Sequence, residues 1–282
     1  MIEVRNLSYR YEGRQGDALR GVDLTIPEGA YFIVVGPNGC GKTTLIRHLN
    51  GLLRPVQGEV LVDGMDTRDS DKAGMIRQRV GMVFGNPDDQ IFGMTVEEDV
   101  AFGPGNLNLP PQEIRRRVDA ALDAVGARAY AKAQPHLLSE GEKQLVAIAG
   151  VLAMDPKYVV LDEPTAYLDP ASRQKVLEVM SSLHRRGITI LHVTHHMEDL
   201  TRADRVVVMK AGTILADKIP SELLSMPDCL RDAGLGLPRV SELLWKLREY
   251  GLDVNPSTLD LEEACREIMA SKSESRSRKI GI

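Results

Sequence analysis

The chain has 282 residues, 43% hydrophobic and 27% charged, with a formal net charge of −5 at pH 7. This is the composition of a globular protein with one large or two smaller domains, and its acidic balance gives no electrostatic footprint for nucleic acid. Three cysteines are too few for a disulfide framework, which favours a reducing compartment. We expect no signal peptide and no membrane span, because the longest apolar runs fall far short of ~20 residues.

Short apolar runs alternate with helical stretches along most of the chain. Strands are predicted at 31–35, 80–84, 158–161, 188–193 and 205–209, and helices at 42–53, 112–125, 139–154 and 171–186. The three strands from residue 158 onward are almost continuously apolar, as strands buried on both faces must be. This alternation predicts an α/β fold around a mainly parallel sheet.

Two regions depart from the pattern. Residues 1–30 and 56–66 alternate polar and apolar side chains between Gly and Asp turns, which predicts an antiparallel β-layer beside the main sheet. After Pro220 the spacing of apolar residues becomes helical, with a last helix predicted from about Thr258 to Ala270. We therefore predict a main domain over 1–220, a helical extension over 221–270 and a polar, disordered tail over 271–282.

The segment GPNGCGKTT at 36–44 matches the P-loop pattern G-x-x-x-x-G-K-[ST] between a predicted strand and a predicted helix. Its glycines let backbone N–H groups turn towards phosphate oxygens, and the helix N-terminus adds its dipole. Lys42 is expected to reach the β- and γ-phosphates, and Thr43 to offer its hydroxyl to Mg²⁺. The predicted nucleotide-binding residues of the loop are Gly36, Pro37, Asn38, Gly39, Cys40, Gly41, Lys42, Thr43 and Thr44.

A second strand delivers carboxylates to the same edge of the sheet. In YVVLDEP (158–164), Asp162 and Glu163 follow the apolar run. Asp162 is expected to hold Mg²⁺ through water, and Glu163 to orient or deprotonate the attacking water. Adjacent acids often only begin a loop, but beside a P-loop the catalytic interpretation is favoured.

The strand ITILHVTHH ends at this edge too, which lets His195 hydrogen-bond the γ-phosphate. The alternative of a metal site formed by His192, His195 and His196 is weak. Neighbours along a strand end point in different directions, and no cysteine or acid at ligand spacing joins them.

These motifs together resemble the ATP-binding cassette (ABC) family over about residues 1–220. GPNGCGKTT looks like the Walker A motif, YVVLDE like Walker B and TAYLDP like the D-loop, with Asp169, while His195 stands at the switch-histidine position. The resemblance implies a P-loop NTPase nucleotide-binding domain that uses ATP and Mg²⁺. It also implies a helical subdomain, at about 86–155, beside the two sheets.

The stretch LSEGEKQ (138–144) contains a capping box, because Ser139 and Glu142 stand three residues apart before an apolar run. It is also similar to the family's LSGGQ signature. The resemblance implies that Ser139, Glu140, Gly141 and Glu142 act on ATP held by a second subunit, so that the active form is a dimer. Tyr11 matches the aromatic residue that stacks on adenine, although an ordinary surface or core tyrosine fits the sequence nearly as well.

A narrower resemblance links residues 86–110 to the ATPases of energy-coupling factor (ECF) transporters, including cobalt-type systems. It implies partners in the membrane, a transmembrane coupling subunit and a substrate-binding subunit, and a peripheral location at its cytoplasmic face. The segment LPRVSELLWKLREYG (237–251) resembles the extension that helps these ATPases dimerise. A helix pair that merely covers an exposed edge is the alternative.

Two positions depart from the resemblance. Gly85 stands in VFGNP where ECF ATPases carry a glutamine that contacts Mg²⁺, and we do not assume that Gln90 replaces it. Glu140 replaces a signature glycine and brings a carboxylate near phosphate, although the helix dipole favours an acid there. We expect reduced but real hydrolysis, and higher turnover for Gly85→Gln or Glu140→Gly.

The sequence therefore predicts an ATP-hydrolysing subunit that energises an ECF-type importer of a vitamin or transition-metal ion. Another type of ABC transporter is the near alternative. A soluble ABC ATPase acting on DNA or ribosomes, or a weakly hydrolysing structural partner in a heterodimer, are further ones. The transported substrate and the choice between homodimer and heterodimer stay open.

Overall fold

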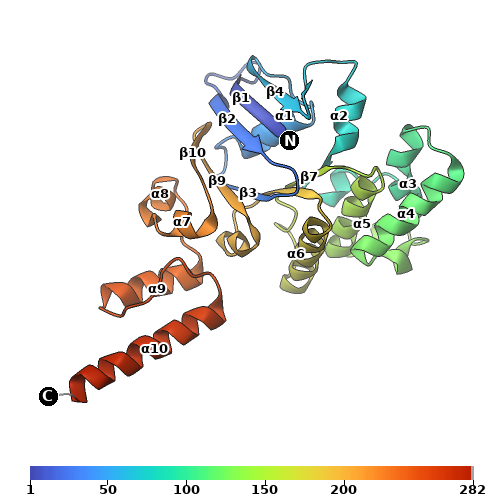
Figure 1. Ribbon diagram of the computed structural model, residues 1–282. Helices are drawn as coiled ribbons and strands as arrows, with labels where there is room; N and C mark the ends of the chain where they lie inside the picture. Colours follow the sequence, from blue (N-terminus) through green and yellow to red (C-terminus); the bar gives the residue numbers. More distant parts are fainter. Residues whose placement is uncertain (281–282) are drawn as a thin grey trace.

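The computed structural model describes residues 1–280 and places a six-stranded sheet at the centre of the molecule (Figure 1). Its order is β10-β9-β3-β8-β7-β6, and all neighbours are parallel except β9 and β10. The strands are β3 (Tyr31–Val35), β6 (Val80–Val83), β7 (Tyr158–Asp162), β8 (Thr189–Val193), β9 (Arg205–Lys210) and β10 (Thr213–Lys218). Every residue of β3 and β8 is buried, which explains why their sequences are mainly apolar.

A four-stranded antiparallel sheet, in the order β2-β1-β4-β5, covers one side of this layer, as the alternating sequence predicts. It contains β1 (Ile2–Tyr9), β2 (Leu19–Ile26), β4 (Gln57–Val62) and β5 (Met65–Asp66). Its buried side chains form one core with those of the first helix and of the facing strands, including Leu45, Val60 and Val207. This layer and the parallel sheet thus hold the first helix between them.

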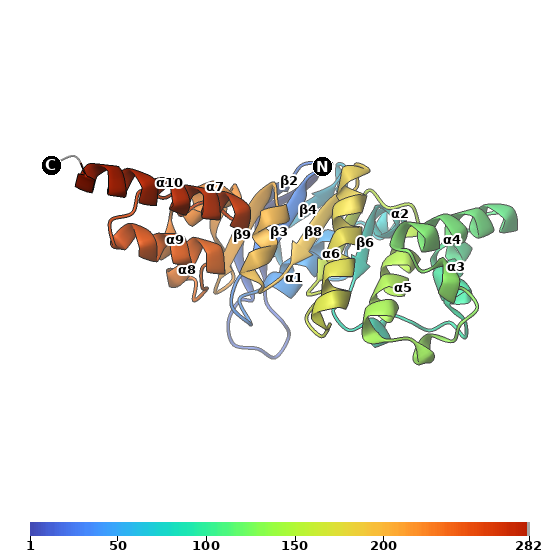
Figure 2. The same ribbon diagram turned by 90° about the horizontal axis from the view of Figure 1, so that it is seen from below.

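Helices connect several of the strands and continue after β10. They are α1 (Lys42–Leu49), α2 (Ala73–Arg79), α3 (Val96–Asn106), α4 (Pro111–Val125), α5 (Glu140–Leu152), α6 (Pro170–Arg185), α7 (Pro220–Leu224), α8 (Pro227–Asp232), α9 (Arg239–Glu249) and α10 (Leu261–Ile280). Short 3₁₀ turns lie at Pro87–Asp89, Arg128–Tyr130, Pro135–Leu137 and Met197–Arg202. Helices α3, α4 and α5 pack on one another at one end of the molecule, and α7 to α10 lie at the other (Figure 2).

Helices α9 and α10 pack through a small apolar cluster of their own, which contains Leu244, Val254 and Ala264. Helix α10 extends from Leu261 to Ile280, and the expectation of a disordered tail over 271–282 stays a prediction. Residues 281–282 lie outside the described residues. Within residues 1–280, no helix has the length and apolar character needed to cross a membrane.

Candidate nucleotide-binding site

The loop at 36–44 connects the end of β3 to the start of α1, where the sequence places a phosphate cradle. A Cβ atom at Gly36 would lie 2.5 Å from the Met209 carbonyl oxygen. At Gly41, φ is 108° and a Cβ would lie 2.7 Å from the Ala18 carbonyl oxygen. Both positions therefore require glycine, which leaves backbone N–H groups at the start of α1 to face an anion.

The Lys42 side chain is buried and folds back over this loop. Its Nζ donates to the Gly36 carbonyl at 2.7 Å and to the Pro37 carbonyl at 3.2 Å. Cys40, a residue of this loop, is buried, and burial raises the pKa of its thiol, so the side chain acts as a packing group rather than a nucleophile. The Lys42 ammonium is thus held at the phosphate-binding loop by two backbone carbonyls, which a bound phosphate would replace.

Asp162 at the end of β7 meets the loop. Thr43 Oγ1 donates to Asp162 Oδ2 at 2.9 Å, while the buried Oδ1 has no hydrogen-bond partner among the described residues. Burial, together with the charge of Glu163, raises the pKa of Asp162. A hydroxyl and a carboxylate with a spare oxygen are the ligands that a hard cation such as Mg²⁺ takes, so the residues fit that ion.

Glu163 and His195, both predicted site residues, lie close together. His195 Nδ1 lies 2.7 Å from Glu163 Oε2, and the Glu163 N–H donates to the Val193 carbonyl at 3.0 Å. Glu163 has a φ of 54°, a conformation that costs a non-glycine residue free energy. His192 lies apart from this pair, fully buried, with its Nε2 4.0 Å from Asp199 Oδ2.

Two cavities meet at Asn38, Thr43, Asp162 and Glu163. One, of about 460 Å³, extends to Tyr11, whose hydroxyl lies 3.1 Å from Thr44 Oγ1. The other, of about 570 Å³, extends past Gly85 to His195. Lining residues of both cavities that were not predicted from the sequence are Arg14, Gln15 and Asp17 in the first, and Arg47, Asn86, Asp89 and Tyr167 in the second. Of these residues, only Arg47 could have been predicted from the sequence, because it lies one helical turn after Thr43.

The predicted capping box at the start of α5 is present. The Ser139 N–H donates to Glu142 Oε2 at 2.8 Å, and the Glu142 N–H to Ser139 Oγ at 3.4 Å. A Cβ at Gly141 would lie 2.5 Å from Ser172 of α6, so this glycine is also needed for the packing of two helices. Asp169 caps α6, accepting from the N–H of Ala171 at 2.9 Å. Neither the signature residues nor Asp169 line the two cavities, and their role toward a second subunit stays a prediction.

The glutamate in the signature is paired within its own chain. Lys143 Nζ lies 3.0 Å from Glu140 Oε1 and 2.8 Å from Asp88 Oδ1. Gly85 is crowded: a Cβ there would lie 2.9 Å from the Asp162 carbonyl oxygen and 3.1 Å from that of Glu163. This close approach changes our expectation for Gly85→Gln. A glutamine side chain fits at position 85 only if the end of β7, which carries Asp162, shifts.

Two glutamines hold the residue before Gly85. Gln90 Oε1 accepts from the Phe84 N–H at 2.7 Å, and the buried Gln144 Nε2 donates to the Phe84 carbonyl at 3.2 Å. The side-chain oxygen of Gln90 is thus hydrogen-bonded to the backbone and is not placed as a metal ligand. The role of Gln144, the last residue of LSEGEKQ, was not predicted from the sequence.

Comparisons with known proteins point to one family. Residues 19–166 match the family model described as ABC transporter. A cobalt import ATP-binding protein, CbiO, from Syntrophus aciditrophicus (strain SB) is 55% identical, over 97% of this chain and 98% of its own length. An energy-coupling factor transporter ATP-binding protein, EcfA1, from Clostridium perfringens (strain ATCC 13124) is 43% identical, over 93% and 95%.

Solved structures give the same result. The structure of cbiO1 from Clostridium perfringens, described as part of the ABC transporter complex cbiONQ, is 37% identical, with a TM-score of 0.75 over 86% of this chain and 98% of that one. The ATP-binding cassette MJ0796, in a dimeric post-hydrolysis state bound to ADP and Pi, is 29% identical, with a TM-score of 0.70 over 78% and 98%.

Proposed function

The chain belongs to the ABC transporter family of ATP-binding subunits, and on this premise we propose that it energises an ECF-type importer by hydrolysing ATP. The observation that carries the proposal is the pairing of His195 with Glu163 at 2.7 Å beside the Thr43–Asp162 pair at 2.9 Å. In this arrangement Glu163 accepts a proton from the attacking water, and His195 positions the carboxylate and hydrogen-bonds the γ-phosphate. Thr43 and Asp162 would hold Mg²⁺, which would supply positive charge that offsets the phosphates.

The functional unit in this proposal is a dimer. Ser139 and Gly141 lie outside the chain's own nucleotide cavities, so they complete a site only when a second subunit presents its P-loop. Helices α9 and α10 expose Leu243 and Met269, which leaves apolar surface for dimer contact. The dimeric MJ0796 structure supports this assembly.

The membrane partners dock on the helical group. Phe92, Met94 and Phe102 in the segment 86–110 expose 77%, 81% and 64% of their surface. Exposed large apolar side chains of this kind mark interaction sites, and we assign this one to a transmembrane coupling subunit, which itself joins a substrate-binding subunit. The protein then lies peripherally at the cytoplasmic face of the membrane. The relative named for cobalt import favours a transition-metal ion as cargo over a vitamin.

The test is Mg-ATP turnover by the assembled membrane complex, compared with the same complex carrying Glu163→Gln. We expect turnover to fall about a hundredfold or more in the variant while ATP binding persists. Equal turnover by the two complexes would refute hydrolysis by this chain. If affinity purification in mild detergent recovers no integral membrane protein, the transporter assignment fails.

A second candidate function, a weakly hydrolysing partner in a heterodimer, is favoured by Gly85 and Glu140. Gly85 affects the site in cis and Glu140 the site in trans, so a homodimer carries both departures in each site and a heterodimer one in each. Copurification distinguishes them, because a heterodimer yields a second ATPase subunit at equal amount.

A further inference from the structure

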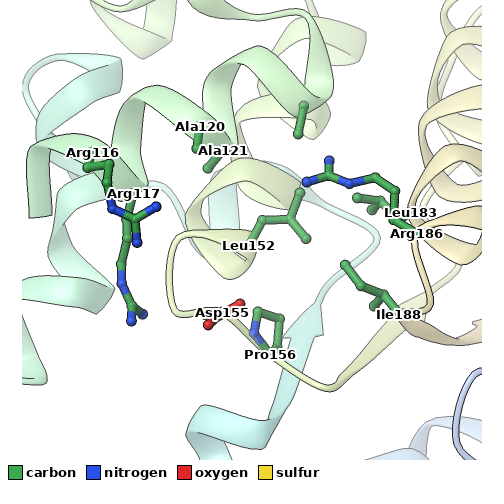
Figure 3. Close-up of a pocket in the computed structure, with 11 residues that line it drawn as sticks. Arg116, Arg117, Ala120, Ala121, Leu152, Asp155, Pro156, Leu183, Arg186 and Ile188 are labelled. Carbon is green, nitrogen blue, oxygen red and sulfur yellow. The ribbon is translucent and has the colours of Figure 1, made fainter. Parts of the chain in front are cut away.

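A third cavity, of about 290 Å³, lies between α4 and the C-terminal ends of α5 and α6 (Figure 3). It shares no lining residue with the two nucleotide cavities, so nucleotide binding does not explain it. Much of its wall is apolar, from Ala120, Ala121, Ala124, Leu152, Leu183 and Ile188.

Three guanidinium groups surround this apolar wall. Arg116 and Arg117 come from α4, and Arg186, just after α6, lies on the opposite side of the cavity (Figure 3). Arg117 Nε donates to Glu113 at 2.8 Å, but its Nη1 is buried with no acceptor among the described residues. Arg186 is exposed and has no ion pair with any residue of the described chain. A buried charged donor without an acceptor is unfavourable, so an anion at this place gains a prepared partner.

The arginines are not needed to cap the helices that end here. The Leu152 carbonyl of α5 accepts the Asp155 N–H at 2.9 Å, and the Leu183 carbonyl of α6 accepts the Ile188 N–H at 3.2 Å. Because the backbone already satisfies these carbonyls, helix capping does not account for the basic residues.

The charge count favours a monoanion. Asp155 lines the cavity and Glu113 binds both α4 arginines, so these two acids offset two of the three positive charges. A purely polar ion such as phosphate would also make no contact with the apolar wall of the cavity. We propose that the cavity binds a small monocarboxylate with a short apolar chain, its carboxylate at Arg117 and its chain against the alanine face of α4.

A ligand bound in this cavity would connect two parts of the fold. A ligand in this position contacts α4 on one side and the α6 end on the other, so it joins the α3–α5 group to the helix that packs on the central sheet. Binding therefore raises the stability of the chain, and this site does not depend on whether the proposed transport function is correct.

The experiment is a hexanoate titration of the full chain, saturated with Mg-ADP, followed by saturation-transfer NMR and by thermal unfolding. We expect saturable binding with a Kd of about a millimolar or tighter, and a rise in Tm. Hexanol lacks the carboxylate and acetate lacks the chain, so both bind more weakly. Absence of saturable hexanoate binding, or equal binding of hexanol or acetate, would overturn the proposal.

Variants test the location. Arg117→Met and Arg186→Met weaken hexanoate binding about tenfold or more, because each removes a charged donor. Ala124→Leu fills the cavity without changing charge and weakens binding too. Arg185→Met, at the exposed neighbouring position outside the cavity, is the matched control. If Arg117→Met and Ala124→Leu fold but bind hexanoate as tightly as Arg185→Met does, the carboxylate is bound elsewhere.

Discussion

Glu140 Oε1 and Lys143 Nζ lie 3.0 Å apart in the first turn of α5, and the same ammonium lies 2.8 Å from Asp88 Oδ1. Lys143 is largely buried, while both acids are half-exposed, so the pairing contributes up to about 1 kcal/mol. The acid that replaces a signature glycine is therefore neutralised in part by a residue of its own helix. Its repulsion of a nearby phosphate is correspondingly smaller than the sequence alone implies.

The first prediction concerns this charge. In the assembled complex, Glu140→Gly and Glu140→Gln are expected to raise ATP turnover by no more than about fivefold, and by less at high salt, where charges are screened. Glutamine is the matched control, because it removes the charge and keeps a side chain at the start of the helix. Unchanged turnover in both variants would mean that the Glu140 carboxylate faces away from the nucleotide.

The second prediction concerns the crowding at Gly85. Both Gly85→Ala and Gly85→Gln are expected to lower the free energy of unfolding by about 1–3 kcal/mol in urea titrations, because their Cβ atoms press on the backbone of Asp162. We also expect Gly85→Gln not to raise turnover. Gly150→Ala in α5, where a Cβ meets no atom within 4 Å, controls for glycine replacement in general. A stable Gly85→Gln variant with faster turnover would restore the original expectation.

The third prediction tests Tyr11. If its ring stacks on adenine, Tyr11→Ala weakens ADP binding by the isolated chain about tenfold, as loss of an aromatic stacking contact does. Tyr11→Phe keeps the ring and loses only the contact between its hydroxyl and Thr44. We expect this variant to bind ADP almost normally. Equal affinity in all three proteins would identify Tyr11 as a packing residue.

The fourth prediction concerns acid stability. Burial lowers the pKa of His192 to about 4, although Asp199 opposes the shift. The folded chain therefore binds fewer protons than the unfolded chain, and stability that is present above the ordinary pKa, 6.5, is lost as pH falls towards 4. His192→Gln is expected to lose about 2 kcal/mol less than the unaltered chain between about pH 7 and pH 5.

The measurement is urea unfolding at the two pH values. The pKa values of His48 and His196 are lowered too, so part of the acid sensitivity persists in the variant. Charged groups that act on His192 include Arg173, His196 and Arg202, and none is altered by the substitution. An identical pH dependence in the two proteins would contradict the role given to His192.

The residues proposed for the site could be predicted because they lie in short contiguous sequence motifs. The P-loop, Asp162, Glu163 and His195 each end a strand of one parallel sheet, so strand order alone brings them to one edge. The contact between Asp88 and Lys143 joins residues 55 positions apart and depends on how the α5 N-terminus meets the turn at Pro87–Asp89. The crowding at Gly85 likewise depends on the separation of two strand ends, which no residue pattern specifies.

Phe84 has its N–H bound by Gln90 and its carbonyl bound by Gln144 on the signature helix. The end of β6 is therefore hydrogen-bonded to α5 at one point, next to Gly85, where an added Cβ would press on the backbone of Asp162 and Glu163. A rotation of α5 that moves Gln144 away from Phe84 breaks its hydrogen bond to this strand end, beside Asp162 and Glu163. In the proposed dimer, this connection links the predicted signature to the carboxylates of the chain's own nucleotide site, so that a movement at one site can be transmitted to the other.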